Sequence, residues 1–382
     1  MQKDLRTWIE IDKNAIEKNY NTFRNLISPE TKMASVVKSN SYGHDLIQFS
    51  QEMEKLGIDF LCVDDIDEAL KLREAKIKTP ILVLGYIPEG RLAEAEKNNI
   101  SITVSNFEKL AQVKNMNLKI HIKVDTGLGR QGFLESNMEK LLAELSGGQV
   151  NTEGLYSHFG VKKPKSNAQV EGLYSHLAIA EDPENSYTEG QVERFKKWVD
   201  AFTSIGVNTI KHISASAAIM GWKDFHFDMV RVGIGMYGLW PSQLVKNRFE
   251  HETSLEPVMT WKAVVSEIKS VSAGESVGYD LTEKLDREST LAIIPVGYWN
   301  GYDRGLSGVG EVVIRDKKCK VVVRIAMCMM IVDITELEDA KVGDEVTLLG
   351  EGQNAEEIAE KANTINYEIV TRINQDISRF YK

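Results

Sequence analysis

MASVV at residues 33–37, FLCVD at 60–64 and PILVLGY at 80–86 are short apolar runs of strand length. The stretches between them have helical patterning, as in DIDEALKLREA at 65–75. Strands that alternate with helices in this way are typical of a parallel sheet whose faces the helices cover.

The same alternation continues from about residue 13 to residue 240. Further strand-like runs are SITVS (101–105), KIHIKVD (119–125), EGLYSH, TIKHISA (209–215) and MVRVGIGMYG (229–238). When EGLYSH, which occurs twice, is counted once, the total is eight strands, the number that closes a (β/α)8 barrel. We therefore expect an α/β fold with a TIM-type barrel over residues 13–240.

The texture of the sequence changes after Pro241. Runs such as MTWKAVVSEIKSV, STLAIIPVGY and GDEVTLLG are separated by turn residues, with no long helix between them. This pattern predicts a β-rich C-terminal domain over residues 241–382. RTWIEID, at residues 6–12, alternates like a strand, so residues 1–12 are assigned to the same domain.

Composition disfavours several classes of protein. The net charge of −10 argues against a nucleic-acid-binding surface. No apolar run has membrane-spanning length, and the first residues lack the apolar stretch of a signal peptide. Three cysteines without a CxxC pair disfavour a disulfide framework or a zinc site. We expect a cytoplasmic enzyme that uses no metal and does not associate with a membrane.

Lys38 directly follows the first barrel strand, and functional residues of such barrels lie at the C-terminal ends of the strands. There the stem of the lysine would be buried. Burial lowers the pKa of an amine and makes its neutral form available for imine formation. A surface lysine after a strand gives the same pattern, so Lys38 alone does not decide between the two.

A second signal lies near the ends of the last two barrel strands. Ser216 precedes a helix start in SASAA, and Gly233 and Gly235 allow backbone amides to approach an anion. Loops at these positions hold phosphate in many such barrels. Together with Lys38, they point to a cofactor that has a phosphate and a carbonyl group.

Six segments carry a resemblance to a known family. They are VVKSNSYGH (36–44), KVDTGLGRQGF (123–133), HISASAA (212–218), MVRVGIGMYGLWPS (229–242), ESVGYD (275–280) and RIAM (324–327). In this order they resemble the alanine racemases, fold-type III enzymes that use pyridoxal 5′-phosphate. The resemblance extends from WIEID (8–12) to the last residues of the chain.

The resemblance implies that Lys38 binds the cofactor as an imine. The implied phosphate ligands are Tyr42, Ser216 and the backbone of Gly233 and Ile234. Arg231 would face the pyridine nitrogen, and because arginine keeps its proton, that nitrogen would stay unprotonated. The cofactor is then a weaker electron sink, which disfavours transamination.

The same resemblance assigns the substrate side of the site. Arg130 would orient a small amino-acid substrate, Lys123 would be carbamylated and hold Arg130, and Met327 would lie near the substrate carboxylate. Racemisation needs a base on each face of the α-carbon, and the implied bases are Lys38 and Tyr279. Tyr279 would enter from the partner subunit of a homodimer with shared sites.

In the family, a histidine at the end of the sixth strand bonds the arginine at the pyridine nitrogen and supports the tyrosine base. EGLYSH supplies two candidates, His158 and His176, because it occurs at 153–158 and again at 171–176. The spacing from Arg130 favours His158. Val170 before the second copy, and the family-like continuation LAIAEDPENSYTEGQVERF after it, favour His176, which we prefer.

Departures from the family pattern bear on the substrate. Cys328 stands where an acidic residue or an amide is usual, and Asp280 stands where glycine is usual. Asn374–Gln375 occupies the expected place of a tyrosine beside phosphate and substrate. Loss of that ring would open the pocket for a larger or more polar side chain.

These observations predict racemisation of L-alanine to D-alanine for cell-wall precursor supply. Serine racemisation of the vancomycin-resistance type is the alternative. A pyridoxal-phosphate carrier built on the same barrel is less consistent with the β-rich domain and Tyr279. A pyridoxal-phosphate decarboxylase would pair the pyridine nitrogen with a carboxylate rather than with Arg231.

Overall fold

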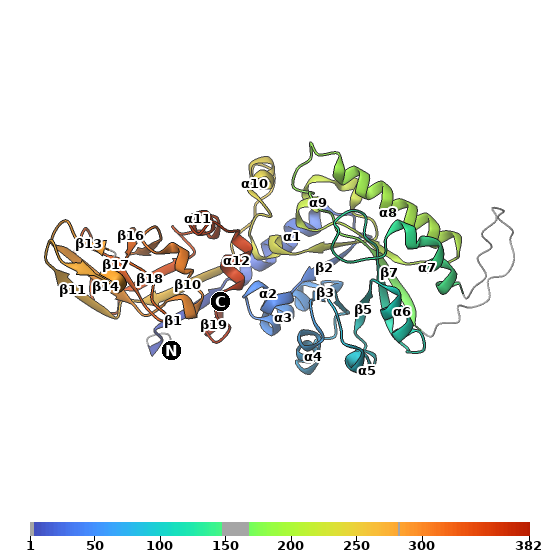
Figure 1. Ribbon diagram of the computed structural model, residues 1–382, viewed down its shortest axis with the longest axis horizontal. Coiled ribbons are helices and arrows are strands. Elements are labelled where there is room, and N and C mark those ends of the chain that lie inside the picture. Colours follow the sequence, from blue (N-terminus) through green and yellow to red (C-terminus); the bar gives the residue numbers. More distant parts are fainter. Residues whose placement is uncertain (1–3, 147–167, 282) are drawn as a thin grey trace.

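Eight parallel strands form a barrel in one half of the molecule, and a mainly antiparallel sheet forms the other half (Figure 1). The computed structural model describes residues 4–146, 168–281 and 283–382. The barrel strands lie in the order β8-β7-β6-β5-β4-β3-β2-β9, and all neighbouring pairs are parallel. The two ends of this sheet meet at a bridge between Ala215 and Arg231. The predicted TIM-type barrel is confirmed.

The predicted barrel runs each overlap one observed strand. The strands are β2 (Lys32–Val36), β3 (Phe60–Val63), β4 (Ile81–Val83), β5 (Ser101–Val104), β6 (Lys119–Lys123), β7 (Gln169–Tyr174), β8 (Ile210–His212) and β9 (Met229–Val232). The helices of this half are α1 (Lys13–Leu26), α2 (Lys38–Tyr42), α3 (Leu46–Leu56), α4 (Ile66–Glu74), α5 (Leu92–Lys97), α6 (Phe107–Val113), α7 (Met138–Leu145), α8 (Tyr187–Ser204), α9 (Ser216–Gly221) and α10 (Gln243–Phe249).

The repeated hexapeptide has one copy in the barrel wall. The second copy, at 171–176, begins inside β7 and ends two residues beyond it. The first copy, with His158, lies outside the described residues.

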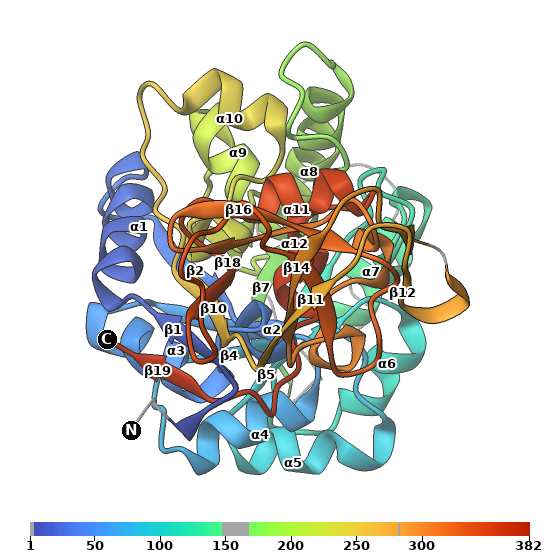
Figure 2. The same ribbon diagram turned by 90° about the vertical axis from the view of Figure 1, so that its left-hand side faces the viewer.

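The second sheet contains the first and the last strand of the chain side by side (Figure 2). β1 (Thr7–Ile11) is antiparallel to β10 (Met259–Val264) and parallel to β19 (Arg379–Tyr381). The strand order is β11-β14-β17-β16-β15-β18-β10-β1-β19. The other strands are β11 (Glu267–Val271), β14 (Ser289–Ile294), β15 (Glu311–Ile314), β16 (Lys317–Val322), β17 (Met330–Asp333) and β18 (Glu345–Leu349), and a separate hairpin consists of β12 (Ser276–Val277) and β13 (Glu283–Lys284).

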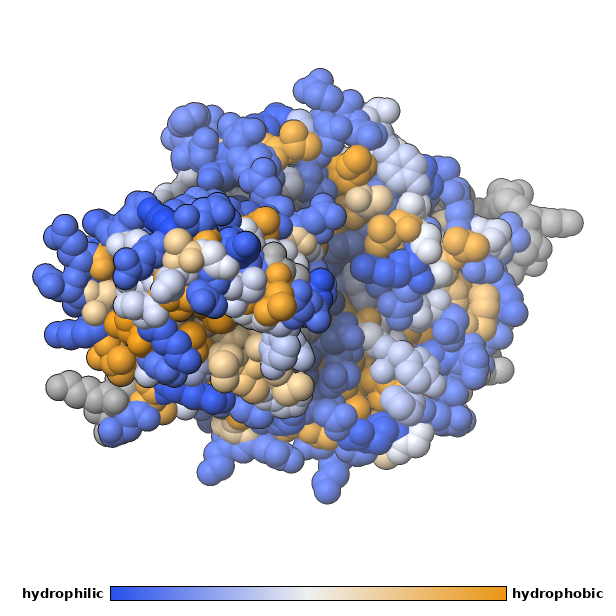
Figure 3. Space-filling model, turned by 60° about the vertical axis from the view of Figure 1, so that its left-hand side comes forward, coloured by the Kyte–Doolittle hydropathy of each residue, from blue (hydrophilic) through white to orange (hydrophobic). Residues whose placement is uncertain are grey.

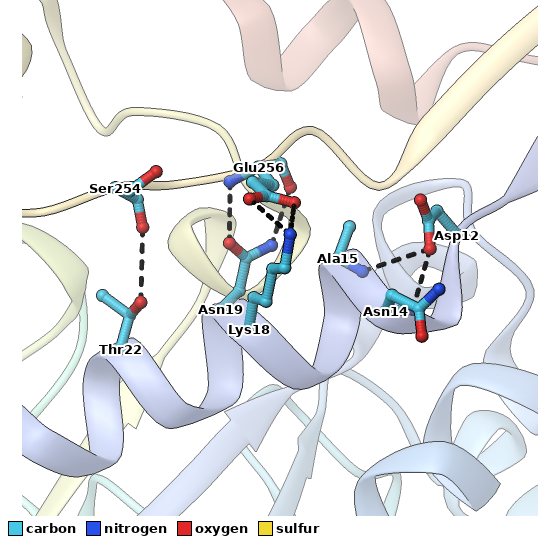
Figure 4. Close-up of polar contacts among 8 residues, drawn as sticks. All are labelled: Asp12, Asn14, Ala15, Lys18, Asn19, Thr22, Ser254 and Glu256. Carbon is cyan, nitrogen blue, oxygen red and sulfur yellow. Dashed lines mark hydrogen bonds and ion pairs between the residues drawn. The ribbon is translucent and has the colours of Figure 1, made fainter.

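Helix α1 ties the barrel to the segment that leads into the second sheet (Figure 4). The Asp12 carboxylate caps the helix by accepting from the backbone N–H groups of Asn14 and Ala15. Further along α1, the Asn19 amide donates to the carbonyl of Glu256, and Lys18 forms an ion pair with the Glu256 carboxylate at 2.8 Å. These contacts hold the connecting segment against the barrel wall.

Two short helices follow β18, α11 (Ala355–Lys361) and α12 (Asn366–Thr371). Helix α12 packs against α2, which begins at Lys38, so a segment of the C-terminal half lies at the mouth of the barrel. In the described part of the chain, no helix is both long and apolar enough to cross a membrane.

Candidate active site

A cavity of about 450 Å³ lies at the C-terminal ends of the barrel strands. It brings together nine of the eleven predicted site residues: Lys38, Tyr42, Lys123, Arg130, His176, Ser216, Arg231, Gly233 and Ile234. A hollow separates the β-rich half, at the front left, from the barrel behind it in the space-filling view (Figure 3). The strand ends of a barrel converge on one face, which explains why residues so distant in sequence meet here.

Lys38 begins an unusual turn after β2. The backbone φ angles of Ser39, Asn40, Ser41 and Tyr42 are all between 51° and 56°, in the left-handed region. Each such non-glycine residue costs about 1–2 kcal/mol, so the surrounding structure must hold the turn. Two contacts do so: the Asn40 N–H donates to Glu68 at 3.0 Å, and the Asn40 side chain accepts from the Leu46 N–H at 2.9 Å.

The turn places Lys38 in the lining of the cavity, with the residue half-buried. The Lys38 side chain is 39% exposed, and its Nζ atom lies 3.4 Å from the Asp64 carboxylate. The lysine stands at a wall of an open cavity, where an opposite charge faces it.

The predicted phosphate segments converge on one hydroxyl. Ser216 begins α9, and its Oγ accepts from the backbone N–H groups of Gly233 at 3.0 Å and Gly235 at 3.4 Å. A Cβ at Gly233 would lie 3.1 Å from the Tyr42 hydroxyl, so this position is close to the limit for any larger residue. Two hydroxyls and two backbone amides thus cluster within one small region, a donor set that suits an oxyanion.

Arg231 lies on β9 and is buried in the barrel, with 3% of its surface exposed. Its guanidinium donates to the Ser175 carbonyl at 2.8 Å and to the Ile213 carbonyl at 3.2 Å. Its Nη1 lies 2.7 Å from Nδ1 of His212, and its Nη2 lies 3.4 Å from Nδ1 of His176. Every one of these partners is an acceptor for a permanently charged donor, so the guanidinium is held in one orientation.

His176 reaches the cavity from the loop after β7. Burial, followed by the positive charges of Arg231 and Arg130, lowers the pKa of His176 to about 3. A neutral imidazole is the result, and it can accept from Arg231 at Nδ1 and keep a proton at Nε2.

Lys123 ends β6 and is buried beneath the cavity. Its amine donates to the Gln131 side chain at 3.0 Å. Burial, and then the charge of Arg130, lowers the pKa of Lys123 to about 8. The neighbouring Arg130 is an exposed residue of the cavity lining, so the two side chains carry like charges in one corner of the site.

Tyr279 and Met327 do not line this cavity. Both lie in the β-rich half, where Tyr279 is 68% exposed and Met327 is 56% exposed. Asp280, which replaces the usual glycine, has a φ of 59° and forms an ion pair with Arg324. The carboxylate therefore anchors a left-handed turn that glycine would otherwise supply without a contact.

The lining of the cavity includes an aromatic residue that was not among the predicted site residues. Tyr367, on α12, lines the cavity beside Tyr42. Asn374 does not line it, and its side chain instead donates to the Trp299 carbonyl at 3.2 Å. The expected placement of Asn374–Gln375 in this pocket is thus wrong, whereas an aromatic ring, that of Tyr367, does line it.

Family models match nearly the whole chain. The alanine racemase N-terminal domain matches residues 11–168 and 161–241, and the alanine racemase C-terminal domain matches residues 258–381. The chain belongs to the alanine racemase family.

Individual alanine racemases agree with this assignment. That of Halothermothrix orenii is 37% identical over 98% of this chain and 97% of its own length. That of Methanococcus maripaludis is 36% identical over 98% of both chains. The solved alanine racemase of Clostridium difficile 630 has a TM-score of 0.89 with 32% identity, and the comparison covers 99% of this chain and 96% of that one.

Two further alanine racemase structures contain bound molecules. The Bartonella henselae enzyme has covalently bound pyridoxal phosphate, with a TM-score of 0.85, 29% identity and coverage of 99% of this chain and 100% of that one. The Bacillus anthracis enzyme has bound L-Ala-P, with a TM-score of 0.89, 31% identity and coverage of 99% and 95%.

The donor set of this cavity fits such an aldehyde cofactor. An amine faces the cavity at Lys38, and hydroxyls with backbone amides gather around Ser216. The guanidinium of Arg231 completes the set from the barrel interior.

Proposed function

We propose that this chain interconverts L-alanine and D-alanine with pyridoxal 5′-phosphate as cofactor. The observation that carries the proposal is the position of Arg231, a buried cation that lines the same cavity as Lys38. A cation at the ring nitrogen suits proton exchange at the α-carbon, whereas a decarboxylase would need a carboxylate there. Membership of the alanine racemase family supports the same reaction.

Lys38 would bind the cofactor, and the hydroxyls of Tyr42 and Ser216 with the backbone of Gly233 and Ile234 would hold its phosphate. When bound, pyridoxal phosphate withdraws electrons from the α-carbon of the substrate, so that the proton there becomes removable. Lys38 would take or return this proton on one face. Arg130, which also lines the cavity, would bind the substrate carboxylate.

The second base would be Tyr279 of the partner subunit in a homodimer. Three observations support a contribution in trans. Tyr279 and Met327 are absent from the cavity of their own chain, and both are exposed. Large apolar side chains nearby in sequence, at Leu281 (69%) and Met329 (51%), are exposed as well. Exposed apolar clusters of this kind mark surfaces that another protein covers.

His176 would couple the tyrosine base to Arg231. A tyrosine needs a nearby positive charge or hydrogen-bond donors to work as a base near neutral pH. The neutral His176 accepts from Arg231 on one side and would offer its Nε2 proton on the other. Through these two hydrogen bonds, the positive charge of Arg231 would stabilise the phenolate form of the tyrosine.

Tyr367 bears on the choice between alanine and serine. The argument for serine depended on an opened pocket, and Tyr367 lines that pocket. A cytoplasmic role in supplying D-alanine for cell-wall precursors completes the proposal.

The decisive experiment is chiral chromatography after incubation of the purified protein with L-alanine and, separately, with L-serine. We expect D-alanine to accumulate to equality with L-alanine, and much slower turnover of serine. Carbon dioxide release, or conversion of neither amino acid, would contradict the proposal.

A further inference from the structure

A chain of buried polar side chains leads from Arg231 through the interior of the barrel. Nδ1 of His212 lies 2.7 Å from Arg231 Nη1, and Nε2 of His212 lies 2.9 Å from Nδ1 of His121. Nε2 of His121 lies 3.2 Å from the Glu171 carboxylate. Both imidazoles are fully buried, so neither ring has water as an alternative partner.

The chemistry of these groups allows one direction of hydrogen bonding. Arginine has only donors, so Nδ1 of His212 must accept and its proton must be on Nε2. That proton is donated to His121 Nδ1, which leaves the His121 proton on Nε2. A carboxylate has only acceptors, so the Glu171 carboxylate can accept the Nε2 proton of His121 and the hydrogen-bonded series ends there.

The same series of hydrogen bonds excludes the doubly protonated, charged form of either His121 or His212. If His121 gained a second proton, its Nδ1–H would face the Nε2–H of His212. A donor would then oppose a donor, either at this contact or at Arg231. The guanidinium and the carboxylate at the two ends therefore fix both tautomers.

An irregularity in strand β7, which includes Glu171, makes room for this series of hydrogen bonds. The pairing of β6 with β7 shifts between Ile120 and His121, so that Glu171 has no opposite residue. A bulge of this type re-aims a side chain. The next residue, Gly172, has no side chain, and a Cβ there would lie 2.1 Å from the His121 ring.

Neighbouring groups hold His212 and Glu171 of this hydrogen-bonded series in place. Tyr174 stacks on His212 with ring centroids 4.7 Å apart and planes inclined by 4°. Ser101 donates to Glu171 at 2.6 Å, and Lys119 lies 3.4 Å from the same carboxylate. Although burial opposes it, these contacts together with that of His121 lower the pKa of Glu171 to about 2, so the terminal acceptor stays charged.

We propose that Glu171 is a positioning residue for Arg231, acting through His121 and His212 to hold the guanidinium in the orientation that it presents to the cavity. The catalytic consequence rests on the proposed racemase function. The tautomers do not rest on it, because they follow from the contacts alone.

Neutron diffraction from crystals of the deuterium-exchanged holoenzyme tests the tautomers directly. We expect deuterium on Nε2 and none on Nδ1 in both His121 and His212. Deuterium on Nδ1 of His212 would overturn the proposal, whatever reaction the protein catalyses.

Kinetics of Glu171 variants test the consequence. In Glu171→Leu the hydrogen-bonded series loses its final acceptor, and kcat should fall about 10-fold, the lower end of the loss caused by removing the outer hydrogen-bond partner of a metal-binding side chain. KM for alanine should stay within about 2-fold, because Arg130 and not Arg231 would bind the substrate carboxylate. Glu171→Gln keeps an oxygen acceptor for His121 and should restore most of kcat.

Glu135→Leu is the matched control, since it removes a surface carboxylate whose partner is Lys197. Equal kcat in Glu171→Leu, Glu135→Leu and the wild type would overturn the proposal. If Glu171→Leu does not fold, the neutron measurement on the wild type still decides. Absence of racemisation in the wild type would sink the proposed function and leave the tautomer result intact.

Discussion

Tyr367 and Tyr42 stand together on the wall of the cavity, with ring centroids 6.1 Å apart and planes inclined by 51°. They come from opposite ends of the chain, and the packing of α12 against α2 brings them together. Both rings line the same cavity as Ser216, so we expect the substrate range to depend on a contact between the two halves of the molecule.

Replacement of Tyr367 should relax the preference for alanine. In Tyr367→Asn we expect the ratio of kcat/KM for serine to that for alanine to rise about 10-fold, the usual scale for one small group in a pocket. Racemisation rates with each amino acid measure it. Asn374→Ala is the control, because Asn374 lies outside the cavity and its loss should leave the ratio unchanged.

Lys38→Ala should abolish cofactor attachment. The purified variant is expected to lack the near-ultraviolet and visible absorbance of the bound cofactor, and racemisation should fall by about 10²- to 10⁴-fold, the range for loss of an acid–base group. Lys55→Ala removes a surface lysine paired with Glu52 and should keep both properties. An unchanged spectrum in Lys38→Ala would contradict the assignment.

The shared site predicts complementation between two inactive variants. Lys38→Ala and Tyr279→Phe should each be nearly inactive as homodimers. In a mixed dimer one site combines the intact Lys38 of one subunit with the intact Tyr279 of the other. After subunit exchange, we therefore expect about a quarter of the wild-type rate. If the mixture stays as inactive as its components, Tyr279 does not act in trans.

Lys123 should react with carbon dioxide at near-neutral pH. Because its pKa is lowered to about 8, about a tenth of the amine is neutral at pH 7, against about 0.04% for an ordinary lysine. The neutral fraction rises as the pH passes through 8. In ¹³C-bicarbonate we expect one carbamate NMR signal that strengthens from pH 7 to 8.

The negative carbamate would attract Arg130, whereas the protonated amine of Lys123 has the same charge as Arg130. Lys123→Arg should lose the signal, and Lys119→Arg should keep it. No signal in the wild type, or persistence in Lys123→Arg, would refute carbamylation at this position.

Two glycine substitutions should have opposite effects on stability. Gly172→Ala would press on the His121 ring and cost about 1–3 kcal/mol. Gly190, inside α8, has its nearest atom at 3.6 Å, so Gly190→Ala should stabilise the helix by about 0.5–1 kcal/mol. Thermal midpoints at one protein concentration compare the two. A midpoint for Gly172→Ala at or above the wild-type value would show that the barrel accommodates the methyl group.

The strands of the barrel were predictable because each is a short apolar run between amphipathic stretches. The predicted runs after Pro241 likewise correspond to strands, among them β10, β14 and β18. The motifs predicted nine residues that do meet in one cavity. The role of Tyr367 was not predicted, because the residue of the C-terminal segment that reaches the cavity is set by the packing of α12 against α2.

The amino-acid sequence by itself determined the alternation of strands and helices, the family and the amine at Lys38, since all of these reside in local pattern. Tertiary structure alone decided that His212, Ser175 and Ile213 surround Arg231, in addition to the predicted His176. The bulge at Glu171, the stacking of Tyr174 on His212 and the arrival of Tyr367 all depend on contacts between distant strands and between the two halves. Local periodicity contains no record of such contacts, because they form only when the barrel closes.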